Sequence, residues 1–285
     1  MQMQTTRMSP RAPLTLGQLK ERAPSVFATH AASRMSQSYA FVSSLQAMDI
    51  MAKVGLVPVD ASQRRAKNDP SVARHLVRLA FKEDLEKAKA RKIGDTMSEV
   101  ILVNSHNGRT AFKLYYGLFR FVCSNGLIVS DHEVGATRRH IGSAEAILEE
   151  VDNILEQGES VIKRVHRMKQ TTLTDAQRLR FAQRALELRY APKDREDEEK
   201  ENPKTLSTIL PEQLLVPRRP EDKGLDLWHT YNVVQENMVV GGLTGKSSNG
   251  RATHTRQLRD VRKLVSVNTG LWDLASSLIR VKEAA

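Results

Sequence analysis

Apolar and polar residues alternate through the first half of the chain with the two-residue period of β-strands. We predict strands at 38–42, 56–65, 72–82, 98–103 and 109–123. The period changes at "SSLQAMDIMAKVG", where the spacing predicts a short helix over 44–54, capped by Ser43 or Ser44 and ended by Gly55. Because Pro58 cannot donate a backbone hydrogen bond, its strand should lie at a sheet edge or carry a bulge.

The stretch from 104 to 131 carries the strongest turn signals. Asn107-Gly108 predicts a tight type I′ hairpin turn, since both central positions of that turn need positive φ. The alternation then slips at Gly117, and a β-bulge and a turn into a short helix both remain open as explanations. Asn125-Gly126 is a second turn signal.

From Ser143 onward the apolar spacing becomes helical. Thr174 and Gln177 have the spacing of a capping box that begins a further helix. We therefore predict an α+β fold: an antiparallel sheet with a short helix after the first strand, then long helices and a helical C-terminal segment. The predicted divisions are a basic N-terminal arm at 1–36, a core domain at 37–190, an acidic, proline-containing linker or loop at 191–224, and a helical segment at 225–285.

The balance of charged residues indicates what kind of partner the protein binds. The 285 residues contain 44 Lys and Arg against 33 Asp and Glu, a net charge of +11, which favours a polyanionic partner. No apolar run approaches the roughly 18 residues that would span a bilayer, and the N-terminus has no signal-peptide core. A single cysteine excludes an internal disulfide framework. We expect a cytoplasmic protein without a membrane partner.

Classical catalytic groups are weakly represented. Cys123 and His106, with His132 or His140, would be a nucleophile and a base, but Cys123 lies in the apolar run "FRFVC" and is better explained as core. No HxxxH, HExxH or CxxC spacing presets a metal site. The segment "VGGLTGKSS" misses a phosphate-binding loop because Val240 stands where glycine is needed, and a helix C-cap explains its glycines. We predict no catalytic, metal or cofactor residues, although Glu99 ahead of a sheet leaves a nuclease open.

Basic residues recur along the predicted strands. The spacing of four in Arg74, Arg78 and Lys82 predicts a strand with one apolar and one basic face. Such rows suit the phosphate backbone of a nucleic acid, because each neutralised phosphate releases counterions. The predicted contacts on the sheet and before the long helix are Arg64, Arg65, Arg74, Arg78, Lys113, Arg120, Arg138 and Arg139, and those in "GKSSNGRATHTRQLRDVRK" are Lys246, Arg251, Arg256 and Arg259. Tyr39 and Tyr115 are candidates for base stacking.

Four motifs, "NSHNG", "GLFRFVCSNG", "RRHIGSAEAILEE" and "LWHTYNVVQENMVVGGL", resemble a phage- and plasmid-borne family described only as a domain of unknown function. The resemblance spans about residues 34–280 and implies a protein of a mobile element. Separately, "SRMSQSYAFVSSLQAMDIMAKVGLVPVDASQ" with "ARHLVRLAFKED" looks like the opening of the Sak-type annealing recombinases, which share a fold with eukaryotic annealing recombinases. The basic helix with a "GLKRAL"-like signature that this second family carries is not evident here.

The second resemblance implies rings or filaments on single-stranded DNA that anneal complementary strands without ATP. We therefore predict a phage-type single-stranded DNA-binding and annealing protein in the cytoplasm of a bacterial host, acting as a homo-oligomer, with a phage exonuclease as a candidate partner. The alternatives are a metal-dependent enzyme on nucleic acid, such as a nuclease, and a non-catalytic structural or regulatory phage protein.

Overall fold

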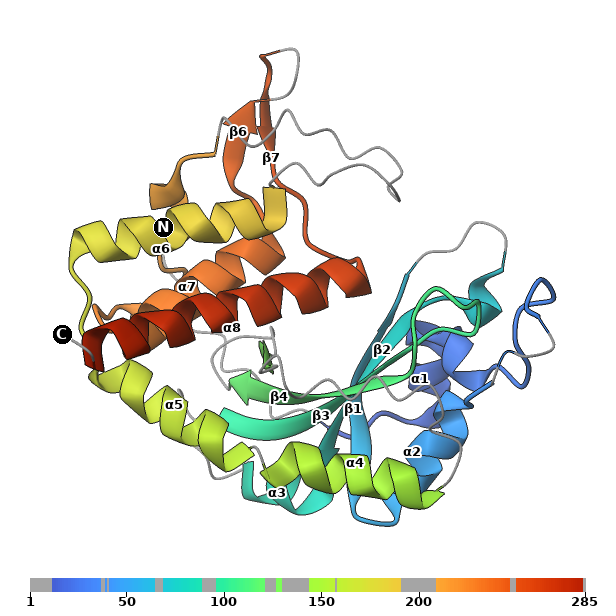
Figure 1. Ribbon diagram of the computed structural model, residues 1–285. Coiled ribbons are helices and arrows are strands. Elements are labelled where there is room, and N and C mark those ends of the chain that lie inside the picture. Colours follow the sequence, from blue (N-terminus) through green and yellow to red (C-terminus); the bar gives the residue numbers. More distant parts are fainter. Residues whose placement is uncertain are drawn as a thin grey trace. The chain divides into compact units, whose positions relative to one another are not determined.

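The computed structural model describes residues 12–36, 39, 41–64, 69–88, 96–120, 127–129, 144–156, 158–190, 209–246 and 250–283 (Figure 1). The chain folds into two compact units, with the boundary between Val161 and Ile162. The core domain predicted at 37–190 extends past this boundary, because helix α6 (Asp175–Tyr190) within it packs with the C-terminal helices.

The first unit is a five-stranded sheet with helices. Its elements are α1 (Leu16–Arg22), η1 (Pro24–Phe27), α2 (Ser44–Ala52), β1 (Leu56–Gln63), η2 (Pro70–Val72), β2 (His75–Phe81), α3 (Lys82–Ala88), β3 (Thr96–Asn104), β4 (Lys113–Arg120), β5 (Leu127–Val129) and α4 (Ala144–Glu156). All neighbouring strands are antiparallel, in the order β1-β2-β3-β4-β5. The α+β class is confirmed.

Strand β1 behaves as its proline predicts. It lies at the edge of the sheet, and its register with β2 shifts between Pro58 and Asp60. The helix before it also follows the sequence, since Ser43 caps α2 by accepting a hydrogen bond from the Gln46 amide. Gly55, with φ of +88°, then turns the chain into β1.

The strand predicted at 38–42 is wrong for its described residues, 39, 41 and 42, which adopt no regular structure. Side chains hold this segment where a backbone ladder was expected. The Tyr39 hydroxyl donates to the Ser105 carbonyl at 3.1 Å, and the Asn104 amide donates to the Val42 carbonyl at 3.0 Å. Tyr39 and Val42 therefore lie against the end of β3 without pairing with it.

The connection between β3 and β4 is also longer than predicted. It runs from 105 to 112, and within it only Gly108 has positive φ, so the type I′ turn is wrong although the hairpin exists. The Ser105 hydroxyl closes the loop by accepting from the Thr110 amide at 2.9 Å. Arg74 donates to the Thr110 hydroxyl as well, so a side chain from the start of β2 fixes this loop.

Gly117 carries no bulge. Ser98–Leu118, Glu99–Gly117 and Val100–Tyr116 pair in an unbroken register, so 113–120 is strand and the helical alternative is wrong there. The apolar positions slip because both faces of β4 are buried, and a doubly buried strand loses its alternation.

The second unit is helical with a projecting hairpin. Its elements are α6 (Asp175–Tyr190), η4 (Pro211–Leu215), η5 (Pro220–Asp222), α7 (Leu227–Val240), β6 (Thr244–Lys246), β7 (Ala252–His254) and α8 (Val261–Glu283), while α5 (Gly158–Gln170) runs across the boundary. Helix α7 is buried almost throughout and packs on α6 and α8. Trp228, Tyr231 and Trp272 form an aromatic cluster between these helices.

Candidate nucleic-acid interface

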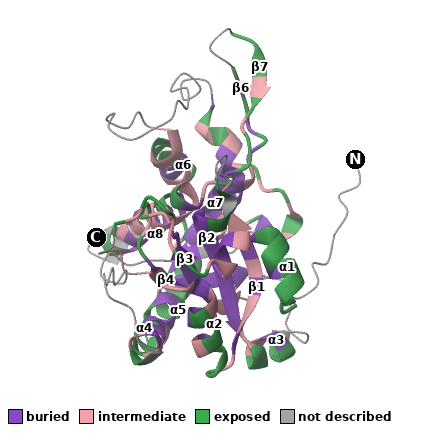
Figure 2. Ribbon diagram, turned by 90° about the vertical axis from the view of Figure 1, so that its right-hand side faces the viewer, coloured by how far each residue is buried: buried purple, intermediate pink, exposed green. Residues whose placement is uncertain are grey.

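The arginines predicted on β2 are buried. Arg78 donates to the Glu99 carboxylate at 2.8 Å, and their side chains are 5% and 0% exposed. Arg74 is buried against the loop at 109–110, where it also donates to the Arg109 carbonyl. The exposed basic face predicted for this strand is therefore wrong, because these guanidinium groups are used inside the protein (Figure 2).

The remaining sheet residues do not form one surface. Residues paired across antiparallel strands share a face, so Arg78, Tyr115 and Lys113 lie on one face, whereas Arg120 lies on the other. Arg120 and Tyr115 are buried, and burial raises the pKa of the Tyr115 hydroxyl. Tyr115 therefore presents no ring for base stacking.

Three further residues predicted to contact nucleic acid are half-buried. Lys113 and Arg64 are half-buried. Tyr39 is half-buried too, with its hydroxyl bonded to Ser105, and burial raises its pKa. Arg65, Arg138 and Arg139, together with Cys123, His132, His140 and the Asn125-Gly126 turn, lie outside the described residues.

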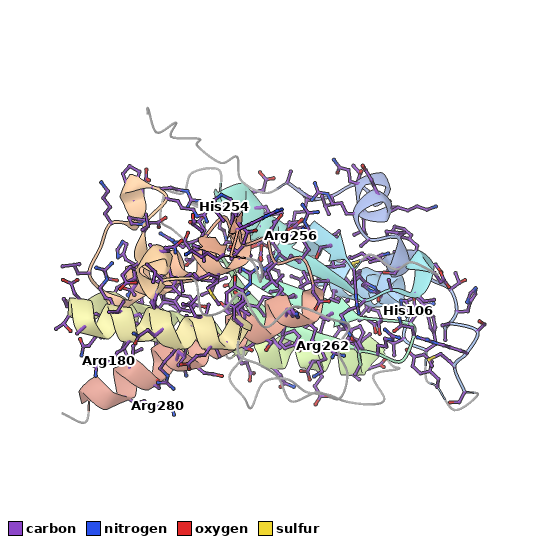
Figure 3. The ribbon with its side chains drawn as sticks, turned by 90° about the horizontal axis from the view of Figure 1, so that it is seen from above. His106, Arg180, His254, Arg256, Arg262 and Arg280 are labelled. Atoms are coloured by element: carbon purple, nitrogen blue, oxygen red, sulfur yellow. The ribbon has the colours of Figure 1, made fainter. Side chains whose placement is uncertain are left out.

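The predicted contacts of the second unit are at the surface. Lys246, Arg251, Arg256 and Arg259 are all exposed, as is Arg262 at the start of α8. His254 and Arg256 lie at the hairpin with Arg262 on α8 (Figure 3), and Figure 2 colours most of the hairpin as exposed. Asp260, the one acidic residue from 244 to 263, accepts from the Lys263 amide at 3.0 Å and so caps α8. We call residues 244–246 and 250–263 the cationic hairpin surface.

Side chains fix the base of this surface to the helices. Arg189 of α6 donates to the carbonyls of Met238 and Arg256, and Arg218 donates to the Gly241 carbonyl. The Gln213 amide bonds both backbone groups of Thr244, at 2.8 and 3.0 Å. The hairpin is thus held at a fixed place on its unit.

The glycines between α7 and β6 are a helix end. The Gly241 amide donates to the Asn237 carbonyl, and φ is +76° at Gly241 and +83° at Gly242. A Cβ on Gly241 would lie 2.7 Å from the carbonyl oxygens of Thr255 and Arg256. This confirms the helix C-cap and excludes the phosphate-binding geometry of a strand–loop–helix at this segment.

Two polar residues of the α7 motif, Glu236 and Asn237, make buried contacts that the composition did not reveal. The Glu236 carboxylate accepts hydrogen bonds from both terminal nitrogens of Arg219. Arg219 also donates to the buried Asp222 at 3.1 Å. Asn237 donates to the carbonyls of Leu214 and Val216, each at 3.0 Å. These contacts attach η4 and η5 to α7, so the polar residues support the hairpin's anchor.

The first unit contains a buried Ser-His cluster that the sequence did not indicate. His75 Nδ1 lies 3.1 Å from the Ala73 carbonyl, which only accepts, so Nδ1 carries the proton and Nε2 accepts from the Ser44 hydroxyl at 2.7 Å. Ser25 contacts Nδ1 at 2.7 Å, and Asn104 donates to Ser44 at 3.0 Å. Ser25, Ser44 and His75 are 0% exposed, so this geometry joins η1 and α2 to the sheet with no access for a substrate.

His106 packs beside this cluster, with its ring centroid 5.4 Å from His75 and 4.9 Å from Phe41. Neither of its buried ring nitrogens makes a hydrogen bond. Burial lowers the pKa of His106 to about 4, although the nearby Ser25 backbone opposes the shift, and burial lowers the pKa of His75 to about 3. Both rings are neutral in the fold, and His106, which the sequence did not favour as a base, bonds no group through its ring nitrogens.

Two further features bear on the function classes. Among the residues that the structure describes, no three His, Cys, Asp or Glu side chains are grouped to hold a metal ion. None of the described helices combines the length and the apolarity needed to cross a bilayer.

The molecule thus has a buried sheet unit and a helical unit with a cationic hairpin, and similarity to known sequences extends across both. The model of the family described as "Domain of unknown function (DUF932)" matches residues 31–272. The chain belongs to this family. DUF932 therefore spans both units, and the predicted resemblance to a family of unknown function is confirmed.

Two Escherichia coli (strain K12) proteins are similar over most of their lengths. UPF0380 protein YfjQ is 31% identical over 271 residues, covering 94% of this chain and 92% of the relative. UPF0380 protein YafZ is 30% identical with the same coverage. No solved structure matches the chain. The resemblance to annealing recombinases stays a prediction.

Proposed function

We propose that this protein binds DNA through the cationic hairpin surface and promotes the pairing of complementary single strands without ATP. One observation carries the DNA-binding part: five Lys and Arg side chains are exposed between 246 and 262, and the single acidic residue among them caps a helix. Annealing rests on the resemblance of residues 33–63 and 73–84 to annealing recombinases, and it needs no bond-making side chain. The protein's part is to neutralise phosphates while base pairing supplies the sequence.

In this proposal the sheet is scaffold and the hairpin is the contact surface. That reverses the emphasis of the sequence prediction, since Arg74, Arg78 and Arg120 are buried. Self-association along DNA, a phage exonuclease partner and a bacterial cytoplasmic location belong to the same proposal.

A binding titration tests it. Five phosphate contacts to a single strand give a salt slope near −3.5, so affinity should fall about 100-fold between 50 and 200 mM salt. The variant Lys246→Ala/Arg256→Ala/Arg259→Ala should bind more weakly, with a slope shallower by about 2. Its matched control is Lys20→Ala/Lys53→Ala/Lys87→Ala, which removes the same charge from exposed positions on the first unit and should bind like the parent.

Sizing and strand pairing complete the test. The complex should contain several copies of the chain, and quenching of a labelled strand by its complement should accelerate without ATP. No affinity at low salt would remove the proposal. Binding by monomers that leave the pairing rate unchanged would remove annealing and keep DNA binding.

A further inference from the structure

One face of the hairpin is exposed, and two of its four side chains are small. Thr244 pairs with His254 and Lys246 pairs with Ala252, so these four residues share one face of the two-stranded ribbon. All four are exposed, whereas Gly245 on the opposite face is buried. The face therefore offers one cationic side chain, Lys246, and one histidine beside two small side chains, with the exposed Arg251 next to Ala252.

No Phe, Tyr or Trp ring accompanies these charges. The second unit has five aromatic residues, and the rings of Phe181, Trp228, Tyr231 and Trp272 are at most 3% exposed. The fifth, Tyr190, is half-buried under the Arg189 guanidinium, 5.0 Å from its ring centre. Proteins that hold single strands without sequence preference stack successive bases on aromatic rings, worth about 1–3 kcal/mol per base, and the only ring on this face is the imidazole of His254.

A duplex suits the same surface better. Its two strands place one charge about every 1.7 Å of axis, and its major groove admits a two-stranded β-ribbon. A small face such as Thr244 and Ala252 enters a groove without steric conflict, while the flanking cations reach phosphates. The anchors at Arg189, Arg218 and Gln213 fix the ribbon beforehand, so binding does not have to order it.

We infer that the hairpin selects double-stranded over single-stranded DNA and holds the duplex that pairing produces. This inference rests on the proposed DNA binding and assigns its substrate class. It also gives annealing a driving force, because a protein that binds the product more tightly than the reactants shifts the equilibrium toward the product by the ratio of its affinities.

The test compares one sequence as a single strand and as a duplex, by fluorescence anisotropy with the full chain at pH 7.5. We expect about tenfold tighter binding of the duplex. Ala252→Glu places a negative charge on the exposed face and should weaken duplex binding by about tenfold or more, with a clearly smaller loss of single-strand affinity. Lys246→Ala should make the duplex salt slope shallower by about 0.9.

The matched control is Ala176→Glu, the same substitution at an exposed position in the first turn of α6. It should leave both affinities unchanged, and melting temperatures should show that all variants are folded. Equal losses for strand and duplex, or parent affinity that is equal for both, would overturn duplex selection and leave DNA binding intact. If the parent binds neither form at low salt, the proposed function fails together with this inference.

Discussion

Acid should destabilise the first unit through two histidines that the fold keeps neutral. His75 and His106 lie side by side in its core, with pKa values that burial lowers to about 3 and about 4. Both titrate near 6.5 in an unfolded chain. Below that pH the unfolded state binds more protons than the folded state. The contribution of the two neutral histidines to the free energy of unfolding is therefore fully present above about pH 6.5, and it is lost as the pH falls toward their pKa values in the folded state.

The size of the effect follows from the two shifts. At pH 5 the unfolded chain has protonated each ring while the folded chain has protonated neither, which removes about 2 kcal/mol per histidine. Together the pair should lower the free energy of unfolding by about 4 kcal/mol between pH 8 and pH 5. That is a large share of the roughly 5–15 kcal/mol that holds an ordinary domain folded.

Urea unfolding at pH 8, 7, 6 and 5, followed by circular dichroism, measures the effect. His106→Leu removes one titrating ring and its two unbonded nitrogens while keeping an apolar contact for Phe41. This variant should lose about 2 kcal/mol less than the parent over the same range. His166→Leu, at an exposed position on α5, is the control and should follow the parent. If His106→Leu has the parent's pH dependence, the argument from buried neutral histidines is wrong.

Three further substitutions test the supports of the fold and the hairpin. Glu99→Ala removes the carboxylate that pairs with the buried Arg78, so it should lower the free energy of unfolding by about 3–5 kcal/mol in urea melts. The double variant Arg78→Met/Glu99→Leu replaces the pair by apolar side chains and should recover most of that loss. Gly241 has a φ of +76°, and a Cβ there would lie 2.7 Å from the Arg256 carbonyl oxygen, so Gly241→Ala should both lower the melting temperature and weaken DNA binding. A variant with the parent's melting temperature would contradict the close packing. Arg219→Met removes the guanidinium that pairs with the buried Glu236 and should lower the free energy of unfolding by about 3 kcal/mol in urea melts at pH 7.

Local signals predicted the elements that depend on a few neighbouring residues. The Ser43 cap, the Gly55 stop and the edge position of Pro58 were all predictable, because each acts through the backbone of its own segment. The strand at 38–42 was not, since Tyr39 and Val42 use partners some 60 residues later in the chain. Alternation failed for β4, where both faces are covered.

The prediction of exposed basic residues was also correct in one part of the chain and wrong in another. The basic cluster at 246–262 was recognised from its local density of Lys and Arg, and these side chains are exposed. The rows on the sheet were misassigned because spacing places Arg74 and Arg78 on a face but does not say what covers that face. The Glu99 that pairs with Arg78 lies on the next strand, and only the strand register brings the two together.

Gln213 has a consequence for how copies of the chain meet. Its side-chain amide occupies the donor and acceptor of Thr244 that a neighbouring strand would otherwise use. Open strand edges are where folded proteins aggregate, and an extended ribbon has two of them. At this residue β6 is closed to strand addition, so the hairpin can stand out in solvent with less risk of joining itself to another hairpin. If copies of the protein assemble on DNA as proposed, they meet through other surfaces. Gln213→Ala should promote aggregation, measured by light scattering, because it exposes this edge.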